Sequence, residues 1–206
     1  MKDIGLVKQV SNRLSVVVAC YNVAEYLPEC LDSILAQSFN NLEVILIDDC
    51  SDDGTAEIVD DYAQQHVNFK AVHNADNLGP SASRNLGITL ATGDWLAFVD
   101  GDDILPVRAY ELMMGSLIKS KSQVATGFVR RFDSKRNKQS FLHKKAIIDD
   151  YRHATFADHP ELLYDTTSWN KIYSLPLLRE NDITFPTGQI YEDVSFTLNA
   201  FLKSTG

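Results

Sequence analysis

Three carboxylates follow an apolar run in the segment LAFVDGDDIL, residues 96–105: Asp100, Asp102 and Asp103. Like charges this close disfavour one another's ionisation unless a cation shares the site. Mg²⁺ and Mn²⁺ prefer oxygen ligands, and Mg²⁺ is commonly held by one or two carboxylates together with the phosphates of a substrate. The segment therefore predicts a metal and diphosphate site, with Asp102 and Asp100 as ligands. The alternative is a solvated acidic turn whose charges favour the start of the next helix.

The elements that must position these acids alternate between strands and helices. Short, continuous β-branched runs are typical of strands buried on both faces. We expect strands at residues 14–19, 42–48, 69–73 and 94–100, separated by amphipathic helical patterns. This alternation predicts βαβ units and an α/β fold with a doubly wound, mostly parallel central sheet and helices on both faces.

Polar residues follow all four expected strands, where a sheet of this kind binds its ligands. These residues are 20–22, 48–49, 74–77 and 100–103. Ser81 is the expected N-cap of the third helix. Beyond residue 108 the pattern is less regular, and we expect a helix at 109–119, a strand near 123–132, a basic loop and a final helix from about Asp193.

Composition is that of an ordinary globular protein: 206 residues, 45% hydrophobic and 23% charged. The odd number of cysteines, Cys20, Cys30 and Cys50, argues against a disulfide framework and favours a reducing compartment. We find no pattern of a secretory signal and no long apolar span, which predicts a cytoplasmic protein.

Charge is distributed unevenly along the chain. Residues 1–105 carry 5 Lys and Arg against 17 Asp and Glu, whereas residues 106–206 carry 14 against 11. An acidic first half argues against a nucleic-acid partner. Positive residues cluster between 130 and 145: Arg130, Arg131, Lys135, Arg136, Lys138, Lys144 and Lys145. This basic cluster is either a solvated loop or a contact for an anionic acceptor or membrane face.

Four ordered motifs resemble those of the family 2 glycosyltransferases of GT-A fold: SVVVACYN, YLPECLDSILAQSFNNLEVILIDDCSDDGT, NLGPSASRNLGITLATGDWLAFVDGDD and YEDVSFTLNAF. The resemblance implies an inverting, metal-dependent enzyme that uses Mn²⁺ or Mg²⁺. It also implies transfer of a hexosyl or N-acetylhexosaminyl group from a nucleotide diphosphate donor, most readily a UDP-sugar. The acceptor would be a hydroxyl of a glycan, a lipid-linked glycan or a cell-wall or capsular polymer.

The resemblance also implies roles for individual residues. The donor-nucleotide pocket would contain Ala19, Tyr21, Asn22, Asp49, Asp52, Arg84 and Asp100. Tyr21 would lie near the base, or else be a partly buried aromatic at a strand end. Arg84 would lie near the nucleotide, with a structural bridge to Asp100 or Asp49 as the alternative. Asn85 and Gly87 are expected to pack the helix on the sheet, and Asp48 to accept bonds from nearby backbone N–H groups.

The late acidic pair Glu192 and Asp193 resembles the one whose aspartate serves as general base. A carboxylate facing the acceptor hydroxyl would remove its proton during attack on the anomeric carbon. The alternative is that both acids only stabilise the start of a helix. Trp169, in SWNKIY, would lie beside the sugar or in the core; Glu192, Asp103 and Trp169 are secondary candidates.

The resemblance divides the chain into an N-terminal extension, residues 1–13, and a GT-A catalytic domain, residues 14–206. Within that domain, 14–105 would be the nucleotide-binding half and 106–206 the acceptor-side half. The ending FLKSTG directly follows a helical pattern, so we expect truncation at the C-terminus.

Cys50 departs from the family pattern, which often has Gly there, and would be strained if the position needs a positive φ. A module of the same fold that binds a nucleotide or carbohydrate without catalysis remains the alternative function.

Overall fold

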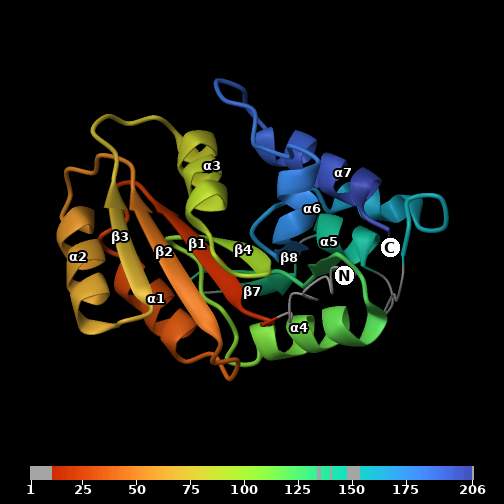
Figure 1. The fold of residues 1–206 in the computed structure, drawn as a ribbon, viewed down its shortest axis with the longest axis horizontal. Helices are drawn as coiled ribbons and strands as arrows, with labels where there is room; N and C mark the ends of the chain where they lie inside the picture. The colour runs from red at the N-terminus through yellow and green to blue at the C-terminus, as the bar shows by residue number, and fades with distance from the viewer. Residues whose placement is uncertain (1–10, 134–135, 140, 148–153, 206) are drawn as a thin grey trace, which may run out of the picture.

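The computed structural model describes residues 11–133, 136–139, 141–147 and 154–205. A six-stranded sheet with the order β3-β2-β1-β4-β8-β5 runs through it (Figure 1). Its strands are β1 (Leu14–Cys20), β2 (Leu42–Asp48), β3 (Phe69–His73), β4 (Trp95–Asp100), β5 (Val124–Thr126) and β8 (Lys171–Ser174). β1 to β4 are parallel, and β8 is antiparallel to both its neighbours. The predicted α/β fold with a mostly parallel central sheet is confirmed.

Helices cover both faces of the sheet, as the hydrophobic patterns predict. They are α1 (Leu27–Leu35), α2 (Thr55–Gln65), α3 (Pro80–Leu90), α4 (Ala109–Ser120), α5 (Phe141–Ala146), α6 (Leu175–Glu180) and α7 (Glu192–Lys203), with a 3₁₀ helix η1 (Pro160–Tyr164). One core joins Val16 and Val18 of β1 to α1, α2 and α4. The other joins Val17 to α3, α6 and α7. Successive residues of β1 thus point to opposite cores.

An aromatic cluster fixes α7 against β4. Phe98 of β4 meets Phe185 and Phe196 edge to face, with ring centroids 5.1 Å and 5.6 Å away. Phe185 and Phe196 stack on each other at 3.9 Å between centroids. Aromatic pairs of this kind add about 0.5–1.5 kcal/mol each beyond their buried area. Because Phe196 lies one turn after the acids that begin α7, the cluster also holds the start of this helix in place.

The region beyond α4 contains more structure than the sequence patterns indicate. The expected strand near 123–132 is two strands, β5 and β6 (Arg130–Asp133), and β6 pairs with β7 (Arg136–Gln139) as an antiparallel ribbon. Much of the basic cluster therefore lies on this ribbon and on α5. Among the described residues, no helix has the length and apolar character needed to cross a membrane.

Ser81 is not the N-cap of α3, contrary to expectation. Gly79 occupies that position with φ of 83°, and Pro80 begins the helix. Proline is suited to the first helical turn because its φ is preset and its missing N–H is not needed there. The Ser81 hydroxyl instead donates to the carbonyl oxygen of Pro186, 2.9 Å away.

Gly87 lets α3 approach β1 closely, as predicted for a packing residue. A Cβ at Gly87 would overlap both methyl groups of Val17. Gly115 of α4 is a matched control, because a Cβ there would meet nothing within 4 Å.

We expect Gly87→Ala to lower the free energy of unfolding by about 1–3 kcal/mol through overpacking. Gly115→Ala should raise it by about 0.5–1 kcal/mol, since alanine is the better helix former. Urea denaturation of both variants measures the difference. Equal effects of the two substitutions would contradict the close packing of α3 on β1.

Candidate functional site

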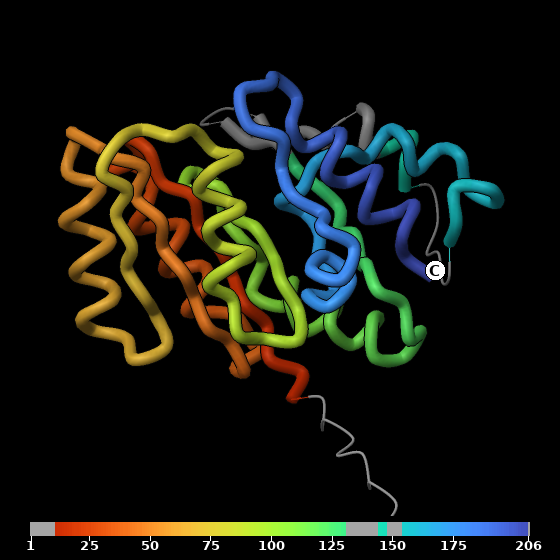
Figure 2. Tube along the Cα trace, turned by 45° about the horizontal axis from the view of Figure 1, so that its top comes forward, coloured from red at the N-terminus to blue at the C-terminus, as the bar shows by residue number. Residues whose placement is uncertain are grey.

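The register of the sheet brings the predicted site residues to one edge. Ala19 of β1 lies opposite Asp100 of β4 on one side and Ile47 of β2 on the other. The loops before α3 and before α7 lie at this same edge in both views (Figures 1 and 2). The hydrogen bond from Ser81 to Pro186 joins the first turn of α3 to the loop before α7. Residues far apart in the sequence therefore meet beyond the carboxyl ends of β1, β2 and β4.

Arg84 is the centre of the site. Its Nη2 lies 2.8 Å from Asp100 Oδ1, and its Nη1 lies 3.2 Å from Glu192 Oε1 and 3.5 Å from Asp193 Oδ1. The guanidinium is nearly enclosed, with 8% of the side chain exposed. The structural bridge to Asp100 exists, whereas the contacts of Arg84 within the described residues include none to Asp49. One buried cation thus joins β4 to the start of α7.

Negative charge exceeds positive charge around Arg84. Burial opposes the cation, but Asp100, Asp193 and Glu192 outweigh that effect and raise the pKa of Arg84. Asp102 and Asp103 follow Asp100 in the chain, and the charges of Asp100 and Asp102 both act on Asp103, so further negative charge lies next to the three carboxylates that Arg84 contacts. Such an excess favours a bound divalent cation, which would lower the mutual repulsion of the acids.

The acids after β4 suit an ion that also binds substrate phosphates. Asp102 is exposed and makes no hydrogen bond or ion pair within the described residues. Asp100 uses Oδ1 for Arg84, and its Oδ2 receives no donor from that same part of the chain. Nowhere in the described ranges do three or more His, Cys, Asp or Glu side chains converge as a metal cage. Hard cations that keep water and phosphate ligands fit an open, two-carboxylate site of this kind.

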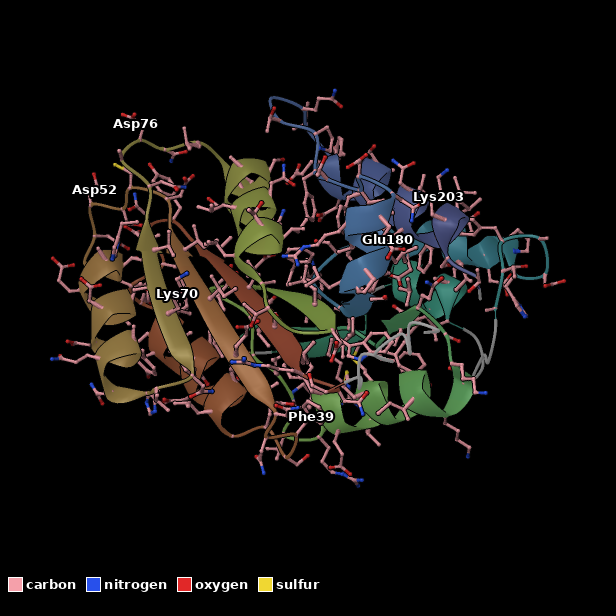
Figure 3. The ribbon with its side chains drawn as sticks, viewed as in Figure 1. Phe39, Asp52, Lys70, Asp76, Glu180 and Lys203 are labelled. Carbon is pink, nitrogen blue, oxygen red and sulfur yellow. The ribbon has the colours of Figure 1, made fainter. Side chains whose placement is uncertain are left out.

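The loops after β1 and β2 are tied to each other beside the predicted base pocket. Asn22 accepts a hydrogen bond from the Asp52 backbone N–H at 3.0 Å, and its own N–H donates to Ser51 Oγ at 3.1 Å. Val23 N–H donates to Thr55 Oγ1 at 2.9 Å. Tyr21, the first residue after β1, is half exposed. Asp52 is also exposed, at the outer edge of its loop (Figure 3).

Asp49 is buried and serves the loop before α3. It accepts hydrogen bonds from Asn74 Nδ2 at 2.6 Å, from Leu78 N–H at 3.1 Å and from Gly79 N–H at 2.7 Å. An ionised carboxylate offers about four acceptor positions, so one remains for a ligand. Contact between Asp49 and a nucleobase therefore stays a prediction, compatible with this geometry.

The expectations for Asp48 and Cys50 are confirmed. Asp48 accepts from the Ser51 backbone N–H at 3.2 Å and lies 3.2 Å from His73 Nδ1. Cys50 has a φ of 63°, the left-handed region in which a side chain costs about 1–2 kcal/mol. Its Sγ is 3.6 Å from the carbonyl oxygen of Ala75, a weak contact across the neighbouring loop. A glycine would adopt this backbone without strain.

Asp193 has a partner that the sequence analysis missed. Ser168 is fully buried and donates from Oγ to Asp193 Oδ1 at 2.8 Å. Its neighbour Trp169 is partly buried. The motif SWNKIY resembles the family, but a serine in a loop carries no signal of its own in the sequence.

The basic cluster is only partly described. Arg130, Lys144 and Lys145 are exposed, and the Lys145 ammonium lies 5.3 Å from the ring centroid of Tyr164. Lys135 lies outside the described residues. The exposed members fit either a solvated surface or contact with an anion.

Asp103 is the most strongly perturbed acid of the cluster. Burial, and then the charges of Asp100 and Asp102, raise the pKa of Asp103 to about 6. The unfolded value is about 3.9. Between these two values the folded state keeps a proton that the unfolded state releases, so stability falls as pH rises through this window.

We therefore expect Asp103→Asn to be more stable than the wild type at pH 8 in metal-free buffer. The gain should be about 1–2 kcal/mol, allowing for partial exposure, and should vanish near pH 4. Urea denaturation with EDTA at both pH values measures it, with Asp61→Asn on the exposed side of α2 as control. A gain that is equal at both pH values would contradict the raised pKa.

Comparisons with known proteins agree with this geometry. Residues 15–180 match the family model described as Glycosyl transferase family 2. EpsJ of Bacillus subtilis (strain 168), described as an uncharacterized glycosyltransferase, is 29% identical over 93% of this chain and 56% of its own length. The poly(ribitol-phosphate) beta-N-acetylglucosaminyltransferase TarS of Staphylococcus aureus (strain Mu50) is 31% identical over 93% of this chain and 33% of its own length. The chain thus spans only part of these relatives.

Solved structures give the same result. S. aureus TarS 1-349 in complex with UDP-GlcNAc has a TM-score of 0.82 and 29% identity, over 93% of this chain and 54% of that one. The mannosyltransferase PcManGT from Pyrobaculum calidifontis, in complex with GDP-Man and Mn²⁺, shares the fold at a TM-score of 0.63 and 23% identity, over 90% of this chain and 50% of that one. The chain belongs to glycosyl transferase family 2 and has the GT-A fold.

Proposed function

We propose that this chain transfers a sugar from a UDP-sugar to a hydroxyl of a cell-wall polymer, with inversion and with a divalent metal ion. The observation that carries the proposal is the Arg84 cluster, which joins the expected metal acid Asp100 to the expected base Asp193. Similarity to TarS, whose solved complexes contain UDP-GlcNAc and UDP, supports the choice of donor. The transferred group is proposed to be a hexosyl or N-acetylhexosaminyl group.

The strand-end acids would hold the ion and the nucleotide. Asp102 and Asp100 are the proposed ligands of Mn²⁺ or Mg²⁺, and Tyr21, Asn22 and Asp49 border the proposed base pocket. When bound, such an ion would offset the negative charge that develops on the departing diphosphate. Arg84 would hold Asp100 in place by its hydrogen bond and neutralise part of the acidic cluster.

Asp193 is the proposed general base. Burial raises the pKa of Asp193, Arg84 and Ser168 oppose this rise, and Asp100 and Glu192 add to it. A raised pKa makes a carboxylate a better proton acceptor near neutral pH. The acid would remove the proton of the acceptor hydroxyl as its oxygen attacks the anomeric carbon.

The acceptor is proposed to be anionic. Both the TarS relative and the poly(ribitol-phosphate) beta-glucosyltransferase of Bacillus spizizenii are named for a phosphate polymer. Exposed Arg130, Lys144 and Lys145 would attract such a polymer, or an anionic membrane face, and the attraction would weaken in salt. A glycan or lipid-linked acceptor and a cytoplasmic location at the membrane's inner face stay predictions.

A first test measures nucleotide binding by calorimetry. We expect UDP to bind in the presence of Mn²⁺, and Asp102→Asn to weaken this binding at least about tenfold because a charged metal ligand is lost. Asp61→Asn, an exposed acid on α2, is the control and should leave binding unchanged. If CDP or GDP binds in preference to UDP in the presence of metal, the proposed donor is wrong and the transferase is kept. If no nucleotide binds, the proposed function is wrong.

A second test separates an enzyme from a binding module of the same fold. Asp193→Asn should lower sugar transfer by about 10²–10⁴-fold, the usual contribution of a general base, with UDP affinity retained. Release of UDP and calorimetric titration provide the two measurements. If the wild type and Asp193→Asn show the same activity, the role of general base is wrong and the binding module is favoured.

A further inference from the structure

A fully buried ion pair joins the first residue of β8 to the loop before it, beside the cluster around Arg84. Lys171 Nζ is 2.8 Å from Asp165 Oδ1, and neither side chain is exposed. The ammonium also donates to the Thr167 carbonyl oxygen at 2.7 Å and to Asn170 Oδ1 at 2.9 Å. Three acceptors thus match the three N–H donors of the lysine. Residues 165–170 thus provide all three acceptors of the buried Lys171 ammonium.

The segment 165–170 is held against the end of β5. Asn170 Nδ2 donates to the Gly127 carbonyl oxygen at 2.9 Å, and Gly127 N–H donates to the Asn170 carbonyl oxygen at 2.8 Å. Thr126 Oγ1 donates to Asp165 Oδ2 at 2.5 Å. These bonds tie the segment to the sheet at both of its ends.

A buried ion pair of this kind is not explained by stability alone. Replacing such a pair by apolar residues of similar volume is often neutral or stabilising, because desolvation offsets the attraction of the charges. The bonds that Lys171 makes to Asp165, Thr167 and Asn170 instead hold this segment in one conformation. From this segment, the Ser168 hydroxyl donates a hydrogen bond to Asp193 of the Arg84 cluster.

Ser168 fixes one oxygen of Asp193. Its hydroxyl donates to Oδ1 at 2.8 Å, and Arg84 Nη1 reaches the same oxygen at 3.5 Å. Oδ2 receives no donor from the described part of the chain. The carboxylate thus has one oxygen held by the protein and one open for a ligand.

We propose that the buried Lys171–Asp165 pair positions Asp193 through Ser168, so that Oδ2 faces the acceptor hydroxyl. The inference rests on the proposed function. In the transfer step Oδ2 takes the proton of the acceptor O–H, and the freed oxygen pair forms the bond to the anomeric carbon. The bond from that carbon to the diphosphate oxygen breaks, and its electron pair leaves with the nucleotide. Lys171, Asp165 and Ser168 are positioning residues.

Charged groups on four elements surround Asp193. They are Arg84 of α3, Asp100 of β4, Glu192 of α7 and Lys171 of β8. None of them is altered when Ser168 is substituted. A change in the pH profile of a Ser168 variant therefore reports the lost hydrogen bond.

The test compares Ser168→Ala and Ser168→Thr with the wild type. UDP release from UDP-glucose or UDP-GlcNAc is followed with poly(ribitol phosphate) as acceptor, from pH 5 to 9, and UDP affinity is measured by calorimetry. Ser168→Ala should lower kcat about tenfold with UDP affinity unchanged. The acidic limb of its pH–activity profile should move to higher pH, because a hydrogen bond to the ionised Asp193 carboxylate is lost. Ser168→Thr keeps the hydroxyl and should restore both.

Ser38→Ala is the matched control, since Ser38 Oγ also donates to a carboxylate, Glu111 Oε2 of α4, at 2.6 Å. It should leave the pH profile unchanged. If the wild type is active and Ser168→Ala has the same kcat and the same acidic limb as the wild type, the inference is wrong and the proposed function stands. A wild type that releases no UDP from either donor would overturn the proposed function and the inference with it. Lys171→Met should reproduce the shifted limb; if it fails to fold, the two Ser168 variants decide.

Discussion

The structure depends on one buried guanidinium. Arg84 contacts acids from β4 and from α7, and its side chain is almost completely enclosed. A charge in such a place is costly unless it is paired, and an acidic cluster is equally costly without a cation. Each therefore requires the other. The position of α3, set by the close approach of Gly87 to Val17, decides where this cation lies.

The fold was largely predictable because its signals are local. Each parallel strand is a short apolar run followed by polar residues, and each of the first three helices has one apolar stripe. The placement of β8 between β4 and β5 was not predictable, since pairing between distant segments leaves no periodicity in either of them. The start of α3 was misjudged because Ser81 looks like an N-cap, whereas Pro80 and a left-handed Gly79 begin the helix.

The site divides in the same way. The position of the strand-end acids was predictable, because Asp100 and Asp102 directly follow an apolar strand pattern. The partners of those acids could not. Ser168 reaches Asp193 only because a buried lysine shapes its loop, and the three donors that Asp49 binds come from a separate loop. Such contacts depend on packing over distances that a sequence pattern does not record.

The ion pairs of Arg84 with Glu192 and Asp193 join residues 108 and 109 positions apart. Contacts between such distant positions form late, because loop closure must precede them. During synthesis the first four strands would emerge from the ribosome well before α7 exists. The half-made chain would carry the strand-end acids without the arginine's later partners. Within the described chain, the acids of α7 are thus among the last groups to join the cluster around Arg84.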